Sequence, residues 1–543
     1  MKEYLRERVG SALKSIGVGD SALPTFEKPR VTEHGDLTTN IAMVVAKHAG
    51  KPPRQLAQRI VDCLDVDKTL VDCVEIAGPG FINFHFTGKF FERQLGDIIR
   101  AGKEFGRLNV GLRKKTQVEF VSANPTGPLT VGHGRGAVFG DTVARLLEWT
   151  GYDVTREYYF NNAGRQMRIL GDSVRLRYLE LFGEKAEYPA DYYQGEYIKT
   201  IAGHLKSEHA DTLKAEPAEG MFKRQAEREI FDDIKKTLQR LGIAFDVFYN
   251  ENSLYETGKI TEVIEEFRTK GLAYDQDGAV WFKASALGGQ KDKVIVKSTG
   301  EPTYRLPDIA YHREKFRRGF EFVVDVFGAD HVATYPDVLA GLRALGLDAT
   351  KVKVLIHQFV TIVQGGEVVK MSTRKANFIT LDELIEEVGA DVVRYFFLMR
   401  SVDSHLNFDL KLAKERSEEN PVYYLQYAHA RIASILRHAE SQGIDGGSPA
   451  DLSLLSHAEE MELMKLLADF PDMVESCAAT FEPHRLAEYL QVVAGSFHKF
   501  YHVHRVITED KAVTAARIAL CLGTKTVLAN GCAILGIAAP EKM

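Results

Sequence analysis

Between about residues 113 and 410, short apolar segments alternate with segments of helical pattern. The clearest apolar segments are TQVEFVSAN, DVTREYYF, FVVDVFGA and KVLIHQFV. Strands that alternate with helices are typical of a parallel sheet whose crossover connections are helical. The sequence therefore predicts an α/β domain with a parallel sheet over residues 113–412.

The two flanks of this region follow other patterns. Residues 1–112 combine helical patterns with VDCVEIAGPGFINFHF, in which alternating apolar residues surround a Gly-Pro-Gly turn. That arrangement predicts a hairpin or a sheet edge. After about residue 415 the strand signals disappear and long segments carry helical periodicity. We therefore predict an N-terminal α/β domain over 1–112 and an all-α helical bundle over 413–543.

Composition limits the class of protein. The chain has 543 residues, with 45% hydrophobic and 27% charged residues, as in soluble globular proteins. We expect no membrane segment and no secretory signal, because long apolar runs are missing. Five cysteines lack CxxC spacing, which predicts buried free thiols in a reducing cytosol and no zinc ribbon. A net charge of −6 gives no global signal for nucleic acid, although a local basic patch can still bind a polyanion.

A glycine-rich stretch, VSANPTGPLTVGHGRGAVFGD, lies between a predicted strand and a predicted helix. His133 and Gly134 fall at the helix N-terminus, where free backbone N–H groups and the helix dipole attract anions. We favour a nucleotide-binding loop, with a plain tight turn as the alternative. Gly132, Gly134 and Ala137 also spell the dinucleotide fingerprint G-x-G-x-x-A, but ANPTGPLTV separates them from the strand, so this match is coincidental.

A second stretch, QGGEVVKMSTRKANFITLDELIEEVG, places several cations on one loop. They are Lys370, Arg374 and Lys375, with hydroxyls at Ser372 and Thr373. A mobile cationic loop suits the charge that develops on a leaving pyrophosphate, and a solvated basic loop is the alternative. Thr380 and Glu383 predict a capping box for the following helix.

Together, TVGH and KMSTR resemble the HIGH and KMSKS signatures of class I aminoacyl-tRNA synthetases. Eight segments narrow the resemblance to the arginyl-tRNA synthetases and cover essentially the whole chain. They are HGDLTTNIAM, AGPGFINF, VEFVSANPTGPLTVGHGRGA, REYYFNNAGRQM, PTYRLPDIAYH, GGEVVKMSTRKANFITLDEL, NPVYYLQYAHARIASIL and APEKM.

The resemblance implies a Rossmann-like catalytic domain, an N-terminal domain that contacts the D-loop at the tRNA elbow, and a helical anticodon-binding domain. It implies an arginine–tRNA ligase that activates L-arginine with ATP and Mg²⁺ to arginyl-adenylate and then charges tRNA(Arg). We expect a cytoplasmic monomer without a resident metal. Catalysis would consist of positioning and electrostatic stabilisation, since no side chain is needed as a nucleophile.

Site residues follow from the matching motifs. For ATP the resemblance implies Gly132, His133, Gly134, Asp330 and Met371. For catalysis it implies Thr130, His133, Lys370, Ser372 and Arg374. For the tRNA D-loop it implies Phe81 and Asn83, through stacking and base-edge contacts.

Six residues would contact arginine: Glu119, Ser122, Asn124, Tyr304, Asp308 and His331. A guanidinium needs a carboxylate partner, often in planar bidentate geometry. Glu119 lies inside an otherwise apolar strand, where an unpaired buried charge is costly. The alternatives are that Glu119 faces solvent on an edge strand and that Asp308 only caps a helix.

Two positions within the signature motifs depart from the family pattern. Thr130 replaces the first signature histidine and can donate a hydrogen bond but carries no charge. Thr373 replaces a lysine, and we expect Arg374 or Lys375 to supply that cation.

Three rival functions share parts of the pattern. A synthetase for another amino acid is disfavoured by the Glu119 and Asp308 pair, which suits a cationic substrate. A catalytically inactive tRNA binder is disfavoured by intact His133, Lys370 and Ser372. A small-molecule nucleotidyltransferase would not need the helical C-terminal third.

Overall fold

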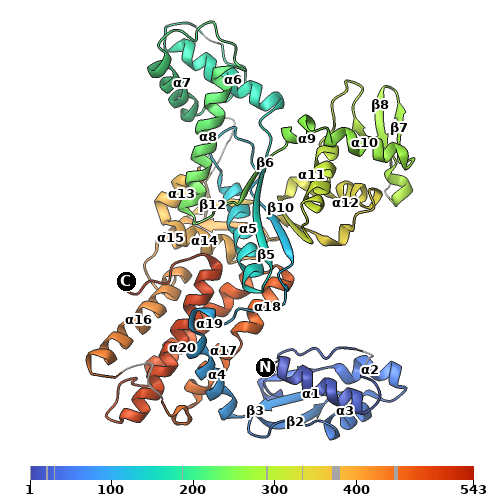
Figure 1. Cartoon of the computed structure of the whole chain (residues 1–543). Coiled ribbons are helices and arrows are strands. Elements are labelled where there is room, and N and C mark those ends of the chain that lie inside the picture. Colours follow the sequence, from blue (N-terminus) through green and yellow to red (C-terminus); the bar gives the residue numbers. More distant parts are fainter. Residues whose placement is uncertain are drawn as a thin grey trace.

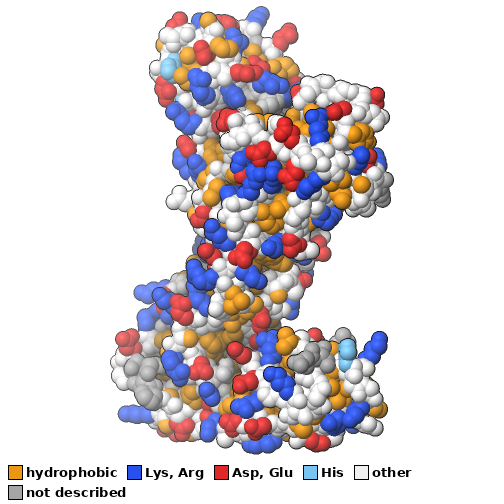
Figure 2. Space-filling model, turned by 45° about the vertical axis from the view of Figure 1, so that its right-hand side comes forward, with side chains coloured by type: hydrophobic (Ala, Val, Ile, Leu, Met, Phe, Trp, Pro, Cys, Tyr) orange, Lys and Arg blue, Asp and Glu red, His pale blue; other side chains and the backbone are white. Residues whose placement is uncertain are grey.

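The computed structural model describes residues 2–19, 22–29, 31–185, 187–288, 291–332, 334–369, 379–444 and 450–543. Figure 1 shows an elongated molecule with a central sheet, two lobes beside it and a helical bundle below. The N-terminal domain stands at one lower corner, and Figure 2 shows a hollow between it and the catalytic region. Basic and acidic side chains are interspersed over the face seen in Figure 2, so no single sign of charge covers it.

The N-terminal domain packs helices on one face of a small antiparallel sheet. The alternating residues Ile82 and Phe84 are buried on that face, and α2 and α3 pack against it. The strand order is β1-β3-β2, and β2 and β3 form the predicted hairpin. The elements are α1 (Lys2–Ser15), β1 (Leu37–Thr39), α2 (Ile41–Ala49), α3 (Pro53–Asp62), β2 (Val71–Ala77) and β3 (Phe81–Phe86).

The central sheet has five parallel strands in the order β11-β10-β4-β5-β6. Four of them coincide with the apolar segments that predicted the parallel sheet, which is confirmed. The strand order reverses beside β4, and such a switch point is where open α/β sheets bind ligands. The strands are β4 (Lys115–Glu119), β5 (Asp153–Phe160), β6 (Val247–Asn250), β10 (Phe322–Gly328) and β11 (Val352–His357).

Two helices cover opposite faces of this sheet. On one face lies α5 (Val131–Trp149). It packs so closely on the sheet that a Cβ atom on Gly140 would collide with the Phe120 side chain, so only glycine fits at this position. Successive side chains of a strand point to opposite faces, so Glu119 points away from α5. There it meets α11 (Arg305–Arg317).

Insertions extend the sheet region. Between β5 and β6 lie α6 (Gly164–Glu180), α7 (Glu196–His209) and α8 (Met221–Arg240). Between β6 and β10 lie α9 (Asn252–Glu256), α10 (Lys259–Thr269), β7 (Ala273–Gln276), β8 (Ala279–Phe282), β9 (Lys293–Val296) and α11, and α12 (Tyr335–Ala344) follows β10. After β11 come β12 (Val360–Gln364), β13 (Glu367–Val368), α13 (Leu381–Val388), α14 (Ala390–Leu398), β14 (Leu406–Asp409) and α15 (Leu410–Lys414).

The C-terminal part is a helical bundle, as predicted. Its helices are α16 (Pro421–Ser441), α17 (Ala458–Ala468), α18 (Phe470–Thr480), α19 (Pro483–Val503) and α20 (Lys511–Leu535). A further helix, α4 (Gly88–Ala101), leaves the N-terminal sheet and packs on α17 and α20. The domain boundaries at residues 112 and 412 stay predictions.

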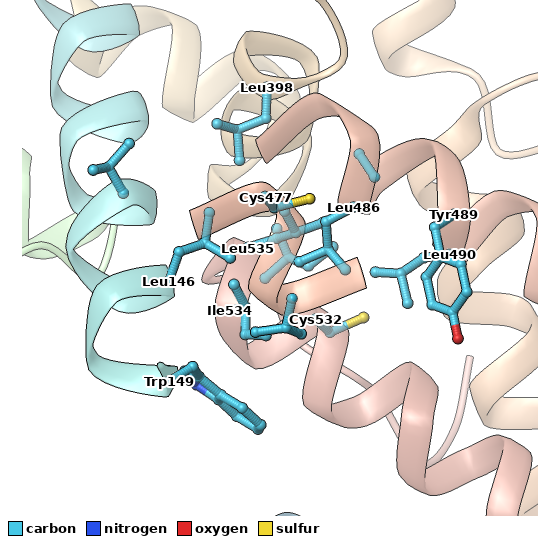
Figure 3. Close-up of a cluster of buried hydrophobic side chains, with 14 of the residues drawn as sticks. Leu146, Trp149, Leu398, Cys477, Leu486, Tyr489, Leu490, Cys532, Ile534 and Leu535 are labelled. Carbon is cyan, nitrogen blue, oxygen red and sulfur yellow. The ribbon is translucent and has the colours of Figure 1, made fainter. Parts of the chain in front are cut away.

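The bundle and the catalytic domain share one apolar core. Figure 3 shows Leu146 and Trp149 of α5 beside Leu486 and Leu535 of the bundle. Among the described residues, one helix (α20) is long and apolar enough to cross a membrane. Most of its apolar window is buried, as in the core helix of a bundle.

The five cysteines are free thiols, and three of them are buried. The expectation that all five are buried is wrong for two. Cys63 is exposed because it ends the surface helix α3, and Cys73 is half-buried on β2.

Candidate active site

The chain makes an unusual turn directly after the central strand β4. Val121 and Ser122 have φ angles of +67° and +44°, a left-handed conformation that a β-branched valine rarely adopts. The Ser122 hydroxyl donates to Glu119 Oε1 at 3.0 Å and accepts the Tyr159 N–H at 3.2 Å. Such backbone strain, about 1–3 kcal/mol per residue, is typical of functional sites.

Three carboxylates form a row across the sheet beside this turn. Asp325 of β10, Glu119 of β4 and Glu157 of β5 are register partners on neighbouring strands. All three are buried, and Glu119 is only 3% exposed. Because β4 is the central strand, the alternative of a solvent-facing Glu119 on an edge strand is wrong.

Helix α11 neutralises part of this row. Lys315 Nζ lies 2.5 Å from Glu119 Oε2 and 2.6 Å from Asp325 Oδ1, and it is fully buried. Arg318 donates to both oxygens of Glu157, at 2.6 and 2.7 Å. Glu119 therefore already has a protein cation as a partner, which the sequence reasoning missed.

Two further carboxylates, Asp308 and Glu251, lie near this row and are largely withdrawn from solvent. Burial raises the pKa of Asp308 to about 7 against the opposing effect of His312, and the carboxylates of Glu119 and Glu251 add to the rise. Burial likewise raises the pKa of Glu251, which accepts a hydrogen bond from the Tyr159 hydroxyl at 2.9 Å. Neither carboxylate pairs with a cation in the described part of the chain.

Asp308 lies inside the first turn of α11 and is not the residue that caps it. Tyr304 occupies the capping position and accepts the Asp308 N–H through its carbonyl at 3.4 Å. The alternative of a purely capping Asp308 is therefore wrong. The Tyr304 side chain itself is 87% exposed, so its ring does not line the site in this structure.

Three tyrosine rings pack together beside these carboxylates, with Tyr311 buried and Tyr159 and Tyr249 partly exposed. The ring of Tyr311 lies 4.4 Å from that of Tyr159 and 4.7 Å from that of Tyr249, measured between centroids. These tilted rings lie beside carboxylates that carry excess negative charge, an environment that suits an apolar stem ending in a cation.

The N-terminus of α5 explains Thr130. Its hydroxyl accepts the His133 N–H at 3.5 Å, and His133 Nδ1 accepts the Thr130 N–H at 3.2 Å, which makes a reciprocal capping box. In the tautomer that accepts at Nδ1, the imidazole proton is on Nε2. Thr130 therefore caps the helix and orients the His133 ring, which explains why a threonine is suitable at this position.

The glycines of this helix have different uses. A Cβ atom on Gly134 would lie 2.6 Å from Leu381, and one on Gly136 would lie 2.9 Å from His357, so both serve close packing. A Cβ on Gly132 would meet nothing nearer than 3.7 Å. Of these glycines, Gly132 therefore has open space beside it at the start of the helix. The ATP contacts predicted for Gly132 and Gly134 stay predictions.

The end of the predicted cationic loop returns to the same helix. Thr380 forms an isolated antiparallel bridge with Thr130, and the Leu381 N–H donates to the Leu129 carbonyl at 2.9 Å. The predicted capping box of Thr380 and Glu383 is confirmed. The residues predicted to act on pyrophosphate or ATP in this loop lie outside the described residues: Lys370, Met371, Ser372, Thr373, Arg374 and Lys375.

The other predicted ligand contacts are spread around the site. Asn124 Oδ1 accepts the Asn161 N–H at 3.0 Å, which joins the β4 and β5 loops. His331 is exposed and its ring stacks on Phe327 at 4.9 Å. Asp330 lies in a short 3₁₀ turn, and its side chain is outside the described set. Their roles remain predictions.

The two residues predicted to contact the tRNA D-loop, Phe81 and Asn83, lie on β3 of the N-terminal domain and not in the catalytic domain. Phe81 is 37% exposed and accessible to a stacking base. Asn83 is only 2% exposed, so a base-edge contact would require its neighbours to move.

A second recess lies in the helical bundle between α16 and α19. It encloses about 740 Å³ and is lined mainly by aromatic and basic side chains, among them Tyr424, Tyr427, Arg431, His498 and Tyr501. The Arg431 guanidinium lies 5.7 Å from the Tyr427 ring and 5.3 Å from the Tyr501 ring. From helical periodicity alone, core packing is the default prediction for Tyr423, Tyr424 and Tyr427, whereas Tyr424 and Tyr427 line this recess.

Comparisons with known proteins cover all three parts of the chain. Family models match for the arginyl tRNA synthetase N terminal domain (3–86), the tRNA synthetases class I (R) catalytic domain (97–395) and the DALR anticodon binding domain (425–543).

Individual relatives agree. The arginine–tRNA ligase of Desulfotalea psychrophila is 53% identical over 96% of this chain and 94% of its own. That of Chlorobaculum parvum is 50% identical over the full length of both chains. The fold of Thermus thermophilus arginyl-tRNA synthetase matches all of both chains with a TM-score of 0.78 at 22% identity. With its class I site at the switch point of a parallel sheet, the chain belongs to the arginyl-tRNA synthetases, the family of arginine–tRNA ligases.

Proposed function

We propose that this arginine–tRNA ligase selects its amino acid through Asp308 and Glu251, with Glu119 held in place by Lys315. The enzyme activates arginine with ATP and charges tRNA in translation. The observation that carries the proposal is the charge balance. Glu119 has a protein cation, whereas Asp308 and Glu251 have none in the described part of the chain.

A guanidinium is planar and carries five N–H donors in a fixed fork, so it can bind two carboxylates at once. Its apolar stem would lie along the partly exposed rings of Tyr159 and Tyr249, which stack at 6.2 Å. Lysine carries a compact ammonium on a different stem length and cannot form the same bidentate contacts. Arginine is therefore the cationic amino acid that this pair of carboxylates would favour.

ATP would bind at the N-terminus of α5, where backbone N–H groups and the His133 imidazole meet phosphate oxygens. We propose that it enters as its magnesium complex, with the metal held mainly by phosphate oxygens. A carboxylate oxygen of arginine attacks the α-phosphorus, the bond to the bridging oxygen breaks, and pyrophosphate leaves. Lys370, Ser372 and Arg374 stay predicted contacts of that leaving group.

In the second step a hydroxyl of the terminal tRNA ribose attacks the carbonyl carbon of the adenylate, and AMP leaves. We propose that a base of the anticodon enters the aromatic recess of the bundle, because Arg431 and the tyrosines can stack on an unpaired base. Phe81 would stack on the D-loop. The enzyme would act as a cytoplasmic monomer.

Pyrophosphate exchange with ATP and L-arginine, run with and without tRNA, tests the overall activity. We expect exchange only when tRNA is present. Exchange with another amino acid but not with arginine would overturn the substrate assignment.

Variants test the pocket itself. Glu251→Gln and Asp308→Asn should each raise the KM for arginine about 10- to 100-fold, since a hydrogen bond to a charged group contributes about 1.5–3 kcal/mol. The KM for ATP should change little. Glu256→Gln, on the exposed face of α9, is the matched control and should leave both values unchanged. An unchanged KM for arginine in both pocket variants would contradict the proposal.

A further inference from the structure

The outer face of the N-terminal sheet brings together three side chains that commonly bind metal ions. Cys73 and Glu75 alternate along β2 and therefore point to the same face. Cys73 is the register partner of His85 on β3. Ile82 and Phe84 point to the helix-covered core, so His85, which is an odd number of positions away from both, points outward with Cys73 and Glu75.

Their ligand atoms are already close. The Cys73 sulfur, a Glu75 carboxylate oxygen and a His85 ring nitrogen all lie within 4.8 Å of one another. His85 Nε2 and Glu75 Oε2 are 3.7 Å apart. In a tetrahedral zinc site with Zn–S of about 2.3 Å and Zn–N or Zn–O of about 2.1 Å, neighbouring ligand atoms are about 3.4–3.6 Å apart. Small side-chain rotations would close the remaining gap.

The histidine also has unused bonding capacity. His85 Nε2 is shielded from solvent and makes no hydrogen bond with any described residue. Gly35, at a φ of +95°, borders the ring, and a Cβ atom there would lie 3.1 Å from Nε2. A side chain at position 35 would press on the Phe84 carbonyl and on the ring, so glycine allows the chain to pack closely against His85.

We propose that Cys73, Glu75 and His85 form a binding site for a divalent cation of the zinc class, with water as a fourth ligand. A thiolate, an imidazole and a carboxylate are a borderline-soft set that favours zinc or cobalt over magnesium. The thiolate and the carboxylate together balance the charge of a divalent ion. The site is separate from the magnesium that would enter with ATP.

The position of the site suggests what the ion does. It would connect β2 to β3, and Phe81 lies on the same outer face of β3 as His85. A bound ion would therefore stiffen the hairpin that presents Phe81. This consequence depends on the proposed D-loop contact, whereas the binding of the ion does not.

Cobalt titration of the full-length protein, purified with chelator and without tRNA, tests the site. Cobalt bound to a thiolate gives a charge-transfer absorption band in the near ultraviolet. We expect this band to saturate at one Co²⁺ per chain and to disappear when Zn²⁺ is added. A chain that shows no thiolate-to-cobalt band contradicts the proposal.

Matched variants locate the ligands. Cys73→Ser should abolish the band, and His85→Gln should weaken cobalt binding by more than about tenfold. Cys63→Ser, which changes an exposed thiol of the same domain, should leave the band intact. A band that survives Cys73→Ser, or that is lost in Cys63→Ser, overturns the assignment.

Thermal unfolding and tRNA kinetics complete the test. Zn²⁺ should raise the Tm of the wild type and of Cys63→Ser, because ligands that bind only the folded state stabilise it, and it should not raise the Tm of Cys73→Ser. If the band and the Tm shift are present but the KM for tRNA is unaffected by metal, the site stands and only the D-loop role fails.

Discussion

Arginine binding should tighten about tenfold between pH 6 and pH 8. The pKa of Asp308 is raised from 3.8 to about 7, mainly by burial. A raised pKa means that the carboxyl is neutral at pH 6 and becomes ionised as the pH rises through 7. The guanidinium binds the ionised form, so affinity is low on the acidic side and is gained as the pH rises.

The size of the effect follows from the ionised fraction. With a pKa of about 7, roughly one tenth of the molecules carry the charged carboxylate at pH 6 and roughly nine tenths at pH 8. The apparent Kd equals the intrinsic Kd divided by the binding-competent fraction, which gives a ratio of about ten. Arginine binding should also release close to one proton at pH 6 and close to none at pH 8.

Isothermal titration calorimetry of L-arginine can measure both quantities. Titrations at several pH values yield the Kd, and repeats in buffers of different ionisation enthalpy yield the number of protons released. Asp308→Asn is the informative variant, because it binds arginine more weakly but should do so with little dependence on pH. Both proteins share the titration of arginine's own amino group, which therefore cancels in the comparison.

If Asp308→Asn keeps the tenfold dependence of affinity on pH, a group other than Asp308 controls arginine binding. A wild type that releases no proton at pH 6 would likewise exclude Asp308 as the titrating group. The variant should in addition be more stable than the wild type at pH 8, because it removes a carboxylate whose ionisation the folded state disfavours. A lower stability at pH 8 would contradict the raised pKa.

Three further substitutions test other parts of the site. Lys315→Met should cost about 3–5 kcal/mol of unfolding free energy, measured by chemical denaturation, because it leaves buried carboxylates without their cation; an unchanged midpoint would contradict this. Gly134→Ala should cost about 1–3 kcal/mol because its Cβ would collide with Leu381, whereas Gly132→Ala should change stability by less than about 0.5 kcal/mol and raise the KM for ATP. Equal stability losses in the two alanine variants would show that packing does not distinguish these glycines. Arg374→Ala should slow pyrophosphate exchange without changing arginine affinity, and an unchanged rate would remove Arg374 from the mechanism.

Local patterns predicted the elements of this fold well. The alternation of strands and helices located β4, β5, β10 and β11, and the spacing of Thr380 and Glu383 predicted a helix start that the structure contains. These signals are short in range, because strand periodicity and capping depend on residues within a few positions of one another.

Long-range partners were beyond reach of the same reasoning. Lys315 lies 196 positions from Glu119, and nothing in the local pattern of α11 distinguishes it from a surface lysine. Glu251 likewise follows a short strand in an ordinary-looking YNEN segment. Only the three-dimensional register of β4, β5 and β10 shows that α11 faces a row of buried carboxylates, which explains why Lys315 is buried beside them.

The metal site shows a related limit. CxxC spacing identifies zinc sites whose ligands lie on turns. The proposed site instead combines alternate positions of one strand, Cys73 and Glu75, with a residue on the neighbouring strand, His85. A pattern of Cys-x-Glu followed by an antiparallel strand with histidine would have been the relevant signal.

Helix α4 joins the N-terminal domain to the bundle, which bears on the two tRNA contacts proposed above. It begins two residues after β3 ends, yet it lies between α17 and α20 of the bundle. The ion pairs Lys28–Asp469 and Lys465–Asp36 join the same two parts. Through these contacts the N-terminal domain is packed onto the bundle, so the proposed D-loop contact at Phe81 and the proposed anticodon recess beside Arg431 would be held at a set separation. An RNA whose elbow and anticodon are separated by a different length would then reach one of the two proposed contacts but not both.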